Sequence, residues 1–155
     1  MNPYAPPEAK LADMPAEAGS PIKAVTFGLL VDLGGTVLAT LVLAFVYGIA
    51  LAVSGASAEE IAAAADPAAT DTAFFYGSIL IGLGFSALGG FVCARIARRD
   101  ETLLGGILAA LSAFIGWVLA GDQYELGTVL SLTLASIGAV LIGARLGGAK
   151  NRGIR

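Results

Sequence analysis

The sequence predicts an all-α integral membrane protein, a transmembrane four-helix bundle with both termini in the cytoplasm. Hydrophobic residues make up 57% of the chain and charged residues only 14%, whereas soluble domains average about 25% charged residues. Four apolar runs each approach or exceed the roughly 20 residues that a membrane-spanning helix needs. The nine Lys and Arg residues all fall on one side of these runs. A chain of 155 residues is therefore expected to form one bundle in one bilayer.

The placement of the basic residues predicts the orientation. They precede the first run, separate the second from the third, or follow the fourth: Lys10, Lys23, Arg95, Arg98, Arg99, Arg145, Lys150, Arg152 and Arg155. The two remaining connections contain acids and no base. Because loops rich in Lys and Arg stay in the cytoplasm, both termini are expected there. The basic clusters are interpreted as topology determinants near anionic lipid headgroups, and no nucleic-acid partner is expected.

The expected spans cover residues 25–53, 73–97, 103–120 and 126–146, within a bundle from 23 to 148. Residues 1–22 are rich in Pro and are predicted to be a disordered cytoplasmic tail, either a solvated leader or a docking segment. Residues 149–155 are predicted to be a basic cytoplasmic tail.

Two features mark the expected outer side. Ser57 and Glu60 have the spacing of a capping box, which predicts a short helix in the connection between the first two spans. Aromatic residues lie near the outer span ends and are interpreted as interface anchors: Tyr47, Tyr76, Trp117 and Tyr124.

Small residues recur at every fourth position in three spans. The members of these stripes that are expected to pack helices are Gly28, Thr36, Thr40 and Gly48 in the first span, Ser78, Gly82, Ser86 and Gly90 in the second, and Gly127, Ser131, Gly143 and Gly147 in the fourth. Membrane helices associate by close backbone approach, which needs small residues one turn apart. Either the stripes pack one monomer, or one stripe faces outward and binds a second copy or another membrane protein.

The second and fourth spans match each other at an offset of fifty residues. Ser86 aligns with Ser136 and Arg95 with Arg145, among other pairs. The match is explained either by duplication of a two-helix hairpin or by the similar composition of apolar helices.

Asp32 is the ionisable residue well inside a span. It lies nine residues beyond Lys23, which is about 13 Å along a helix. An unpaired carboxylate there costs at least about 2.5 to 3.5 kcal/mol, so it should be protonated, paired or in contact with water. Three interpretations are open: an ion pair with Arg95 or Arg145, a capping or water-bridged role beside Gly34 and Gly35, or a proton- or cation-binding site.

The stretch Leu30-Val31-Asp32-Leu33-Gly34-Gly35-Thr36 resembles the first helix of small multidrug resistance transporters. Those proteins are four-helix bundles whose first span carries one essential acid followed by Gly and Thr. The resemblance implies that Asp32 would be a shared site for proton and substrate. The family's acid is Glu and its chain is shorter, so the match is confined to this helix.

A second resemblance covers the second and third spans. The run Leu88-Gly89-Gly90-Phe91-Val92-Cys93-Ala94-Arg95, a basic turn and then Gly105-Gly106 are similar to uncharacterised four-helix bacterial inner-membrane proteins. That resemblance implies the same topology and no activity.

The remaining chemistry of the chain is sparse. Cys93 is the single cysteine and there is no His, so neither an intrachain disulfide nor a His or multi-Cys metal site can form, and no cofactor is expected. No Ser-His-Asp set or P-loop is present, and the chain is not expected to be an enzyme. The sequence predicts a bacterial inner-membrane protein that serves as a non-enzymatic subunit, scaffold or accessory protein. The alternative is a proton-coupled small-molecule transporter that uses Asp32.

Overall fold

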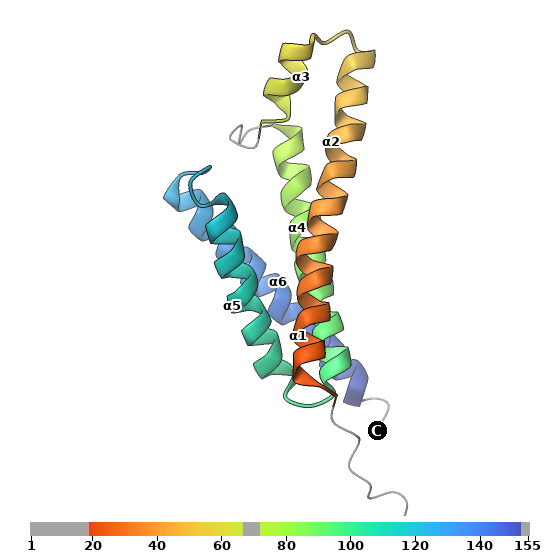
Figure 1. Cartoon of the computed structure of the whole chain (residues 1–155), viewed down its shortest axis with the longest axis vertical. Coiled ribbons are helices and arrows are strands. Elements are labelled where there is room, and N and C mark those ends of the chain that lie inside the picture. Colours follow the sequence, from red (N-terminus) through yellow and green to blue (C-terminus); the bar gives the residue numbers. More distant parts are fainter. Residues whose placement is uncertain (1–18, 67–71, 153–155) are drawn as a thin grey trace, which may run out of the picture.

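The computed structural model describes residues 19–66 and 72–152, and the predicted all-α fold with four span-length helices is confirmed. The described residues are helical almost throughout and include no strand. Four helices are long and apolar enough to cross a membrane. The chain is therefore a small multi-pass membrane protein built as a bundle of four spans (Figure 1).

The first span consists of α1 (Pro21–Leu29), the π-helical turn η2 (Leu30–Gly34) and α2 (Gly35–Val53). It begins earlier than expected, because the Ser20 side chain accepts a hydrogen bond from the Lys23 backbone N–H and Pro21 opens the first turn. Its 33 residues extend about 50 Å. Since the hydrocarbon core is about 30 Å thick, this span must tilt or project beyond it.

The short helix predicted in the first connection is present as α3 (Ala58–Ala64), with Ser57 and Glu60 forming a complete capping box. The Glu60 backbone N–H donates to Ser57 Oγ at 3.2 Å, and the Ser57 N–H donates to Glu60 Oε2 at 2.7 Å. The remaining spans are α4 (Ala73–Ala97), α5 (Glu101–Ala120) and α6 (Leu126–Arg152). Helix α6 thus continues through much of the predicted basic tail, and residues 1–18 and 153–155 lie outside the described residues.

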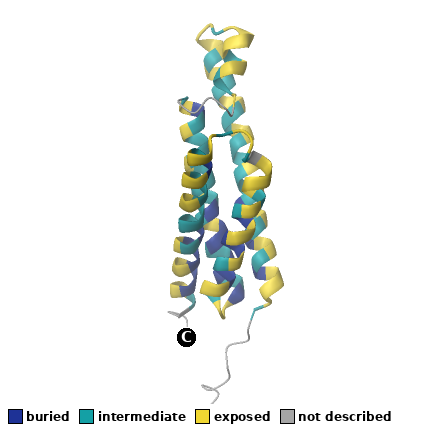
Figure 2. Ribbon diagram, turned by 90° about the vertical axis from the view of Figure 1, so that its left-hand side faces the viewer, coloured by how far each residue is buried: buried dark blue, intermediate teal, exposed yellow. Residues whose placement is uncertain are grey.

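The four spans form two pairs that diverge from one end (Figure 1). We call the end where α1 begins and α6 ends the closed end, and the end toward α3 the open end. Buried residues are concentrated toward the closed end (Figure 2), where a core cluster includes Ala24, Cys93, Leu108 and Val140. Toward the open end, α5 and α6 separate from α2 and α4.

The most extensive helix contact joins α4 and α6, which cross each other and run in the same chain direction, from the open end to the closed end. A methyl group added to Gly143 would lie 1.8 Å from the backbone oxygen of Ala87, and one added to Gly90 would lie 2.1 Å from that of Val140. Such distances mean that the two backbones touch, which only glycine permits. Gly28 in α1 is similarly enclosed, with Cys93 Cβ 2.9 Å from the position of an added methyl.

Other members of the small-residue stripes are not enclosed in this way. An added methyl on Gly127 would meet no atom within 4 Å, and one on Gly48 would approach only Ile61, at 3.8 Å. Ser131 is exposed and donates to the Gly127 backbone oxygen, and Thr40 is half-buried. Tight packing is thus concentrated in the part of the bundle near the closed end.

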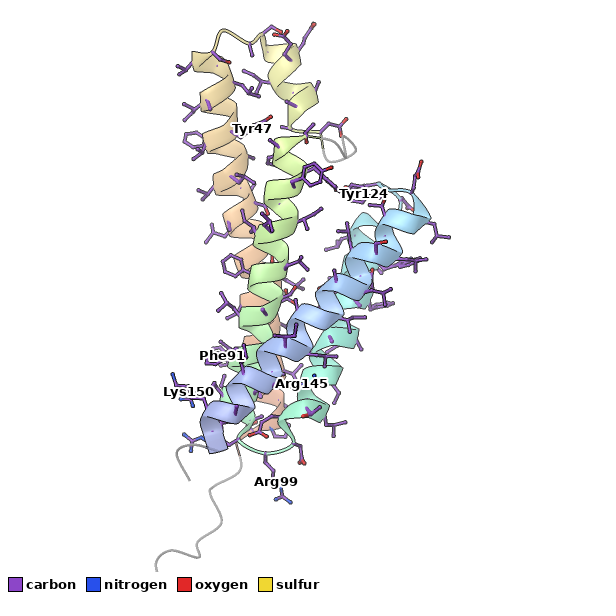
Figure 3. All side chains as sticks on the ribbon, turned by 180° about the vertical axis from the view of Figure 1, so that it is seen from behind. Tyr47, Phe91, Arg99, Tyr124, Arg145 and Lys150 are labelled. Atoms are coloured by element: carbon purple, nitrogen blue, oxygen red, sulfur yellow. The ribbon has the colours of Figure 1, made fainter. Side chains whose placement is uncertain are left out.

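Several aromatic side chains gather toward the open end. Tyr47 stacks on Phe74 with ring centroids 6.0 Å apart, and Phe75 lies 5.9 Å from Tyr124. Figure 3 shows Tyr47 and Tyr124 well away from Arg99, Arg145 and Lys150. Tyr76 and Trp117 are exposed, as interface anchors would be. Tyr124 instead turns toward the interior of the bundle, beside Phe75.

Candidate functional site

Asp32 is buried, with 3% of its surface exposed, and lies in the π-helical turn η2. The close approach of α1 and η2 to α4 places it there: an added methyl on Gly89 would lie 2.6 Å from the Gly28 backbone oxygen and 2.8 Å from Asp32 Cβ. The Thr36 hydroxyl donates to the Asp32 backbone oxygen at 2.5 Å. Short π-helical turns often occur at functional sites. Here the turn carries the buried acid of the first span.

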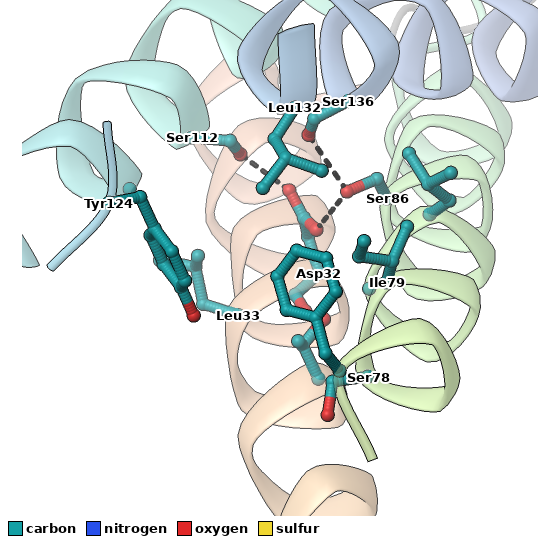
Figure 4. Close-up of a pocket in the computed structure, with 14 residues that line it drawn as sticks. Asp32, Leu33, Ser78, Ile79, Ser86, Ser112, Tyr124, Leu132 and Ser136 are labelled. Atoms are coloured by element: carbon teal, nitrogen blue, oxygen red, sulfur yellow. Dashed lines mark hydrogen bonds between the residues drawn. The ribbon is translucent and has the colours of Figure 1, made fainter. Parts of the chain in front are cut away.

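The Asp32 carboxylate accepts hydrogen bonds from two serines on other spans (Figure 4). Ser86 Oγ of α4 donates to Oδ1 at 2.8 Å, and Ser112 Oγ of α5 donates to Oδ2 at 2.5 Å. Ser136 Oγ of α6 lies 3.1 Å from Ser86 Oγ. Because the single Ser86 proton goes to Asp32, Ser136 must donate to Ser86. We call Asp32, Ser86, Ser112 and Ser136 the serine–aspartate cluster, to which each span contributes one side chain.

The serine–aspartate cluster forms one wall of a cleft of about 280 Å³. Its lining includes apolar side chains, the rings of Phe75 and Tyr124, and hydroxyl groups (Figure 4). The lining residues are Asp32, Leu33, Thr36, Phe75, Ser78, Ile79, Gly82, Leu83, Ser86, Ser112, Gly116, Tyr124, Leu132 and Ser136. Asp32 is the one acid among them, and none is a Lys or Arg. The cleft therefore offers a single carboxyl group in an otherwise uncharged, amphipathic environment.

The expected ion pair of Asp32 with Arg95 or Arg145 is not formed. Arg95 instead donates to Asn151 Oδ1 at 3.1 Å, and the Asn151 amide donates to Glu101 Oε1 at 3.2 Å. Arg145 is exposed near the closed end (Figure 3).

Helix length explains why neither arginine reaches the carboxylate. Arg95 follows Ser86 by nine residues, and Arg145 follows Ser136 by nine. Nine residues of helix span about 13 Å. Since Ser86 and Ser136 lie beside Asp32, both arginines lie about that far from it along the bundle.

Acidic residues lie close to Tyr124, one of the residues that line the cleft. Burial, and then the negative charge of Asp66, raise the pKa of the Tyr124 hydroxyl. Asp66 thus acts on a residue that lines the cleft, although it belongs to the connection after α3. Asp122 and Glu125 are exposed on either side of Tyr124 in the chain. This arrangement favours the approach of cations.

Four residues identified from the sequence as helix-packing positions line the cleft: Thr36, Ser78, Gly82 and Ser86. Sequence analysis did not single out Ser112, and it considered Ser136 only as part of a repeat. Counting residues from the basic residue at the closed end of a span would have placed three of the four cluster residues at the same depth. Asp32 follows Lys23 by nine residues, and Ser86 and Ser136 each precede an Arg by nine.

Comparison with known proteins adds no assignment to this geometry. No family model matches the chain, and no match was found among curated proteins or solved structures. The two resemblances noted in the sequence therefore remain expectations, and the functional argument depends on the serine–aspartate cluster and the cleft.

Proposed function

We propose that this protein is a proton-coupled carrier of small amphipathic organic cations, with Asp32 as the membrane-embedded binding carboxylate. The observation that supports the proposal is that Asp32 lines a cleft and has serine partners where an arginine was expected. A carboxylate neutralised by an arginine would be a structural element with no remaining charge to offer. The carboxylate in this cleft has no cationic partner among the residues that line it, and so it is available to a ligand or a proton.

Charge supports a monovalent cation as the ligand. Ionisable residues inside membranes are costly and commonly mark proton, ion or substrate pathways. The single carboxylate of the cleft is balanced by one positive charge, which either a proton or a ligand can supply. Cation and proton would occupy Asp32 in turn, so that binding of one releases the other, and this exchange would couple the two fluxes.

Size and lining support a small amphipathic molecule. The volume of about 280 Å³ lies at the lower end of ligand pockets, which are commonly about 300 to 1,000 Å³. Phe75 and Tyr124 contribute aromatic rings to the lining, and the faces of such rings attract ammonium groups. Leu83 and Leu132 add apolar surface. Together these groups suit an ammonium with an attached apolar or aromatic group.

Titration of benzyltrimethylammonium into the protein in lipid nanodiscs, followed by calorimetry, tests the proposal. Neopentylbenzene has the same shape without the charge and serves as the ligand control. We expect the ammonium to bind and the neutral molecule to bind at least about tenfold more weakly, equivalent to 1.4 kcal/mol. Titrations in two buffers of different ionisation enthalpy should show proton release on binding.

Asp32→Asn should weaken ammonium binding at least about tenfold and abolish proton release. Asp100→Asn is the matched control, because Asp100 is exposed between α4 and α5 at the closed end and does not line the cleft. In proteoliposomes with an acidic interior, the parent protein should accumulate the ammonium while Asp32→Asn does not. Equal affinity for the two ligands, or an unchanged Asp32→Asn variant, would contradict the proposal.

A second candidate function is that of a non-enzymatic membrane subunit or scaffold. It is supported by surfaces left open within the bundle: α2 has no buried residue along its length, and Gly127 and Ser131 are exposed on α6. Either surface would bind a second copy or another membrane protein. Leucine substitutions at Gly127 and Ser131 should then lower the oligomer mass measured in nanodiscs, whereas an unchanged mass would argue against an interface there.

We also propose a bacterial inner-membrane location with both chain termini in the cytoplasm. The support is the distribution of charge over the two ends of the bundle. Arg99, Arg145 and Lys150 lie toward the closed end (Figure 3), whereas Glu59 and Glu60 belong to α3 at the opposite end. Loops with Lys and Arg are retained on the cytoplasmic side. The cleft would then face outward from the cell.

A further inference from the structure

We infer that the serine–aspartate cluster is a binding site for a dehydrated sodium ion, which competes with the proton and the organic cation for Asp32. The inference deepens the proposed function and rests on it, since it names a further coupling ion of the same site. Five side-chain oxygens from four helices converge there: two from Asp32 and one each from Ser86, Ser112 and Ser136.

The donor set selects the class of ion. Carboxylate and hydroxyl oxygens are hard ligands and suit alkali and alkaline-earth cations rather than transition metals. The cluster holds one negative charge, and no group of three His, Cys, Asp or Glu residues able to hold a metal occurs among residues 19–66 and 72–152. A divalent ion would therefore leave an uncompensated positive charge in a low-dielectric interior. A monovalent ion is neutralised by Asp32 alone.

The spacing of the oxygens favours sodium over potassium. Neighbouring oxygens of the cluster lie 2.5, 2.8 and 3.1 Å apart. A larger ion would force its ligands further apart than a smaller one. Moving α6 away from α4 to admit a larger ion would cost packing, because these two helices make the most extensive contact of the bundle.

The serine hydroxyls have somewhere to donate when an ion takes their lone pairs. In the structure, Ser86 and Ser112 donate to Asp32, so ion binding requires their protons to turn away. A helical serine can donate to the backbone oxygen four residues earlier. Ser78 donates in this way to Phe74, at 2.8 Å, and Ser131 does so to Gly127, at 2.8 Å. The same rotation would free the oxygens of the cluster without leaving a buried donor unpaired.

Sodium, proton and organic cation would exclude one another under this arrangement. Each neutralises the same carboxylate, and a second positive charge beside it would be buried without a partner. Sodium should therefore lower the apparent affinity for benzyltrimethylammonium.

Ion-dependent stability in nanodiscs tests the inference. Thermal unfolding is followed while NaCl, KCl or N-methyl-D-glucamine chloride is varied at constant ionic strength. A ligand that binds only the folded state raises the unfolding temperature as its concentration rises. We expect sodium to do so and the other two cations not to. Ser112→Ala and Ser136→Ala should each raise the sodium concentration needed by about tenfold.

Ser131→Ala is the matched control, since its hydroxyl donates within its own helix and it does not line the cleft, and it should keep the sodium response. Asp32→Asn should abolish the sodium response if the variant folds. If it does not fold, the responses of the serine variants test the inference. An equal response to sodium and potassium, or a sodium response that survives in both cluster variants, would overturn the inference. Ammonium binding without any sodium response would overturn it and leave the proposed function standing, whereas failure of both ligands would overturn both.

Discussion

The contact between α4 and α6 at Gly143 gives the sharpest test of the packing argument. In Gly143→Ala the new methyl would lie 1.8 Å from the Ala87 backbone oxygen, whereas ordinary contacts of a Cβ begin at about 3.4 Å. The helices must therefore separate by about 1.6 Å or distort locally. Overpacking costs about 1 to 3 kcal/mol. We expect about 3 kcal/mol because the obstructing atom is backbone and cannot rotate away.

Gly138→Ala is the matched control on the same helix, because no atom lies within 4 Å of its added methyl. Replacing Gly by Ala in a helix adds up to about 1 kcal/mol of stability. Equilibrium unfolding in mixed micelles, followed by circular dichroism, should thus show changes of opposite sign for the two variants. Equal unfolding free energies would refute the claim that α4 and α6 touch at this position.

The same substitution should also disturb the site. Ala87 follows Ser86 directly in the chain, and Ser86 lies 3.1 Å from Ser136 across the same helix contact. A separation of about 1.6 Å would break that hydrogen bond. Gly143→Ala should therefore weaken benzyltrimethylammonium binding while Gly138→Ala leaves it unchanged.

Three further predictions concern other parts of the molecule. Ser112→Ala removes a hydrogen-bond donor to a buried carboxylate and should lower the unfolding free energy by about 1.5 to 3 kcal/mol. Exposed Ser131→Ala is the control and should lower the unfolding free energy by about 0.5 kcal/mol or less. Hydrogen bonds with Ser57 lower the pKa of the Glu60 carboxyl below its ordinary value of 4.5. The cap of α3 should therefore be intact above pH 4.5 and be lost as the pH falls through the lowered pKa of Glu60. Amide hydrogen exchange of α3, measured as a function of pH, checks this, and exchange that does not change with the state of the cap would contradict it. Ser57→Cys should react with an impermeant maleimide outside intact cells, and buried Cys93 should give no background labelling. Labelling of Ser57→Cys only after the cells are permeabilised would invert the proposed topology.

The four spans were predictable because the length of an apolar run sets whether it can cross a bilayer. The capping box of α3 was predictable because it depends on local spacing. The end of α6 was not, because it depends on tertiary contacts. Gly147 packs against the Phe91 backbone, and the Asn151 side chain donates to the Ala94 backbone oxygen at 2.9 Å, which extends the helix to Arg152.

The buried acid of the candidate site was predictable from the sequence, but its hydrogen-bond partners were not. Asp32 was expected to face other helices because it lies on a small-residue stripe, and it is buried among them. Its partners were not foreseen, because serine in a membrane helix serves equally as a small packing residue and as a hydrogen-bond donor. Sequence spacing does not reveal which helix faces which, and the contact of Ser86 with Ser136 follows from the parallel packing of α4 and α6.

The pairing of α4 with α6 has a consequence for biogenesis. Helices emerge from the ribosome in chain order, and N-terminal parts fold first. Helix α4 therefore enters the bilayer before its main partner exists and must wait until α5 and α6 have been synthesised. During that interval the glycine face around Gly90 has no helix to touch, and Asp32 has only part of its final set of serine donors. The serine–aspartate cluster is completed by the last helix to be made, so assembly of the bundle and completion of the proposed binding site coincide.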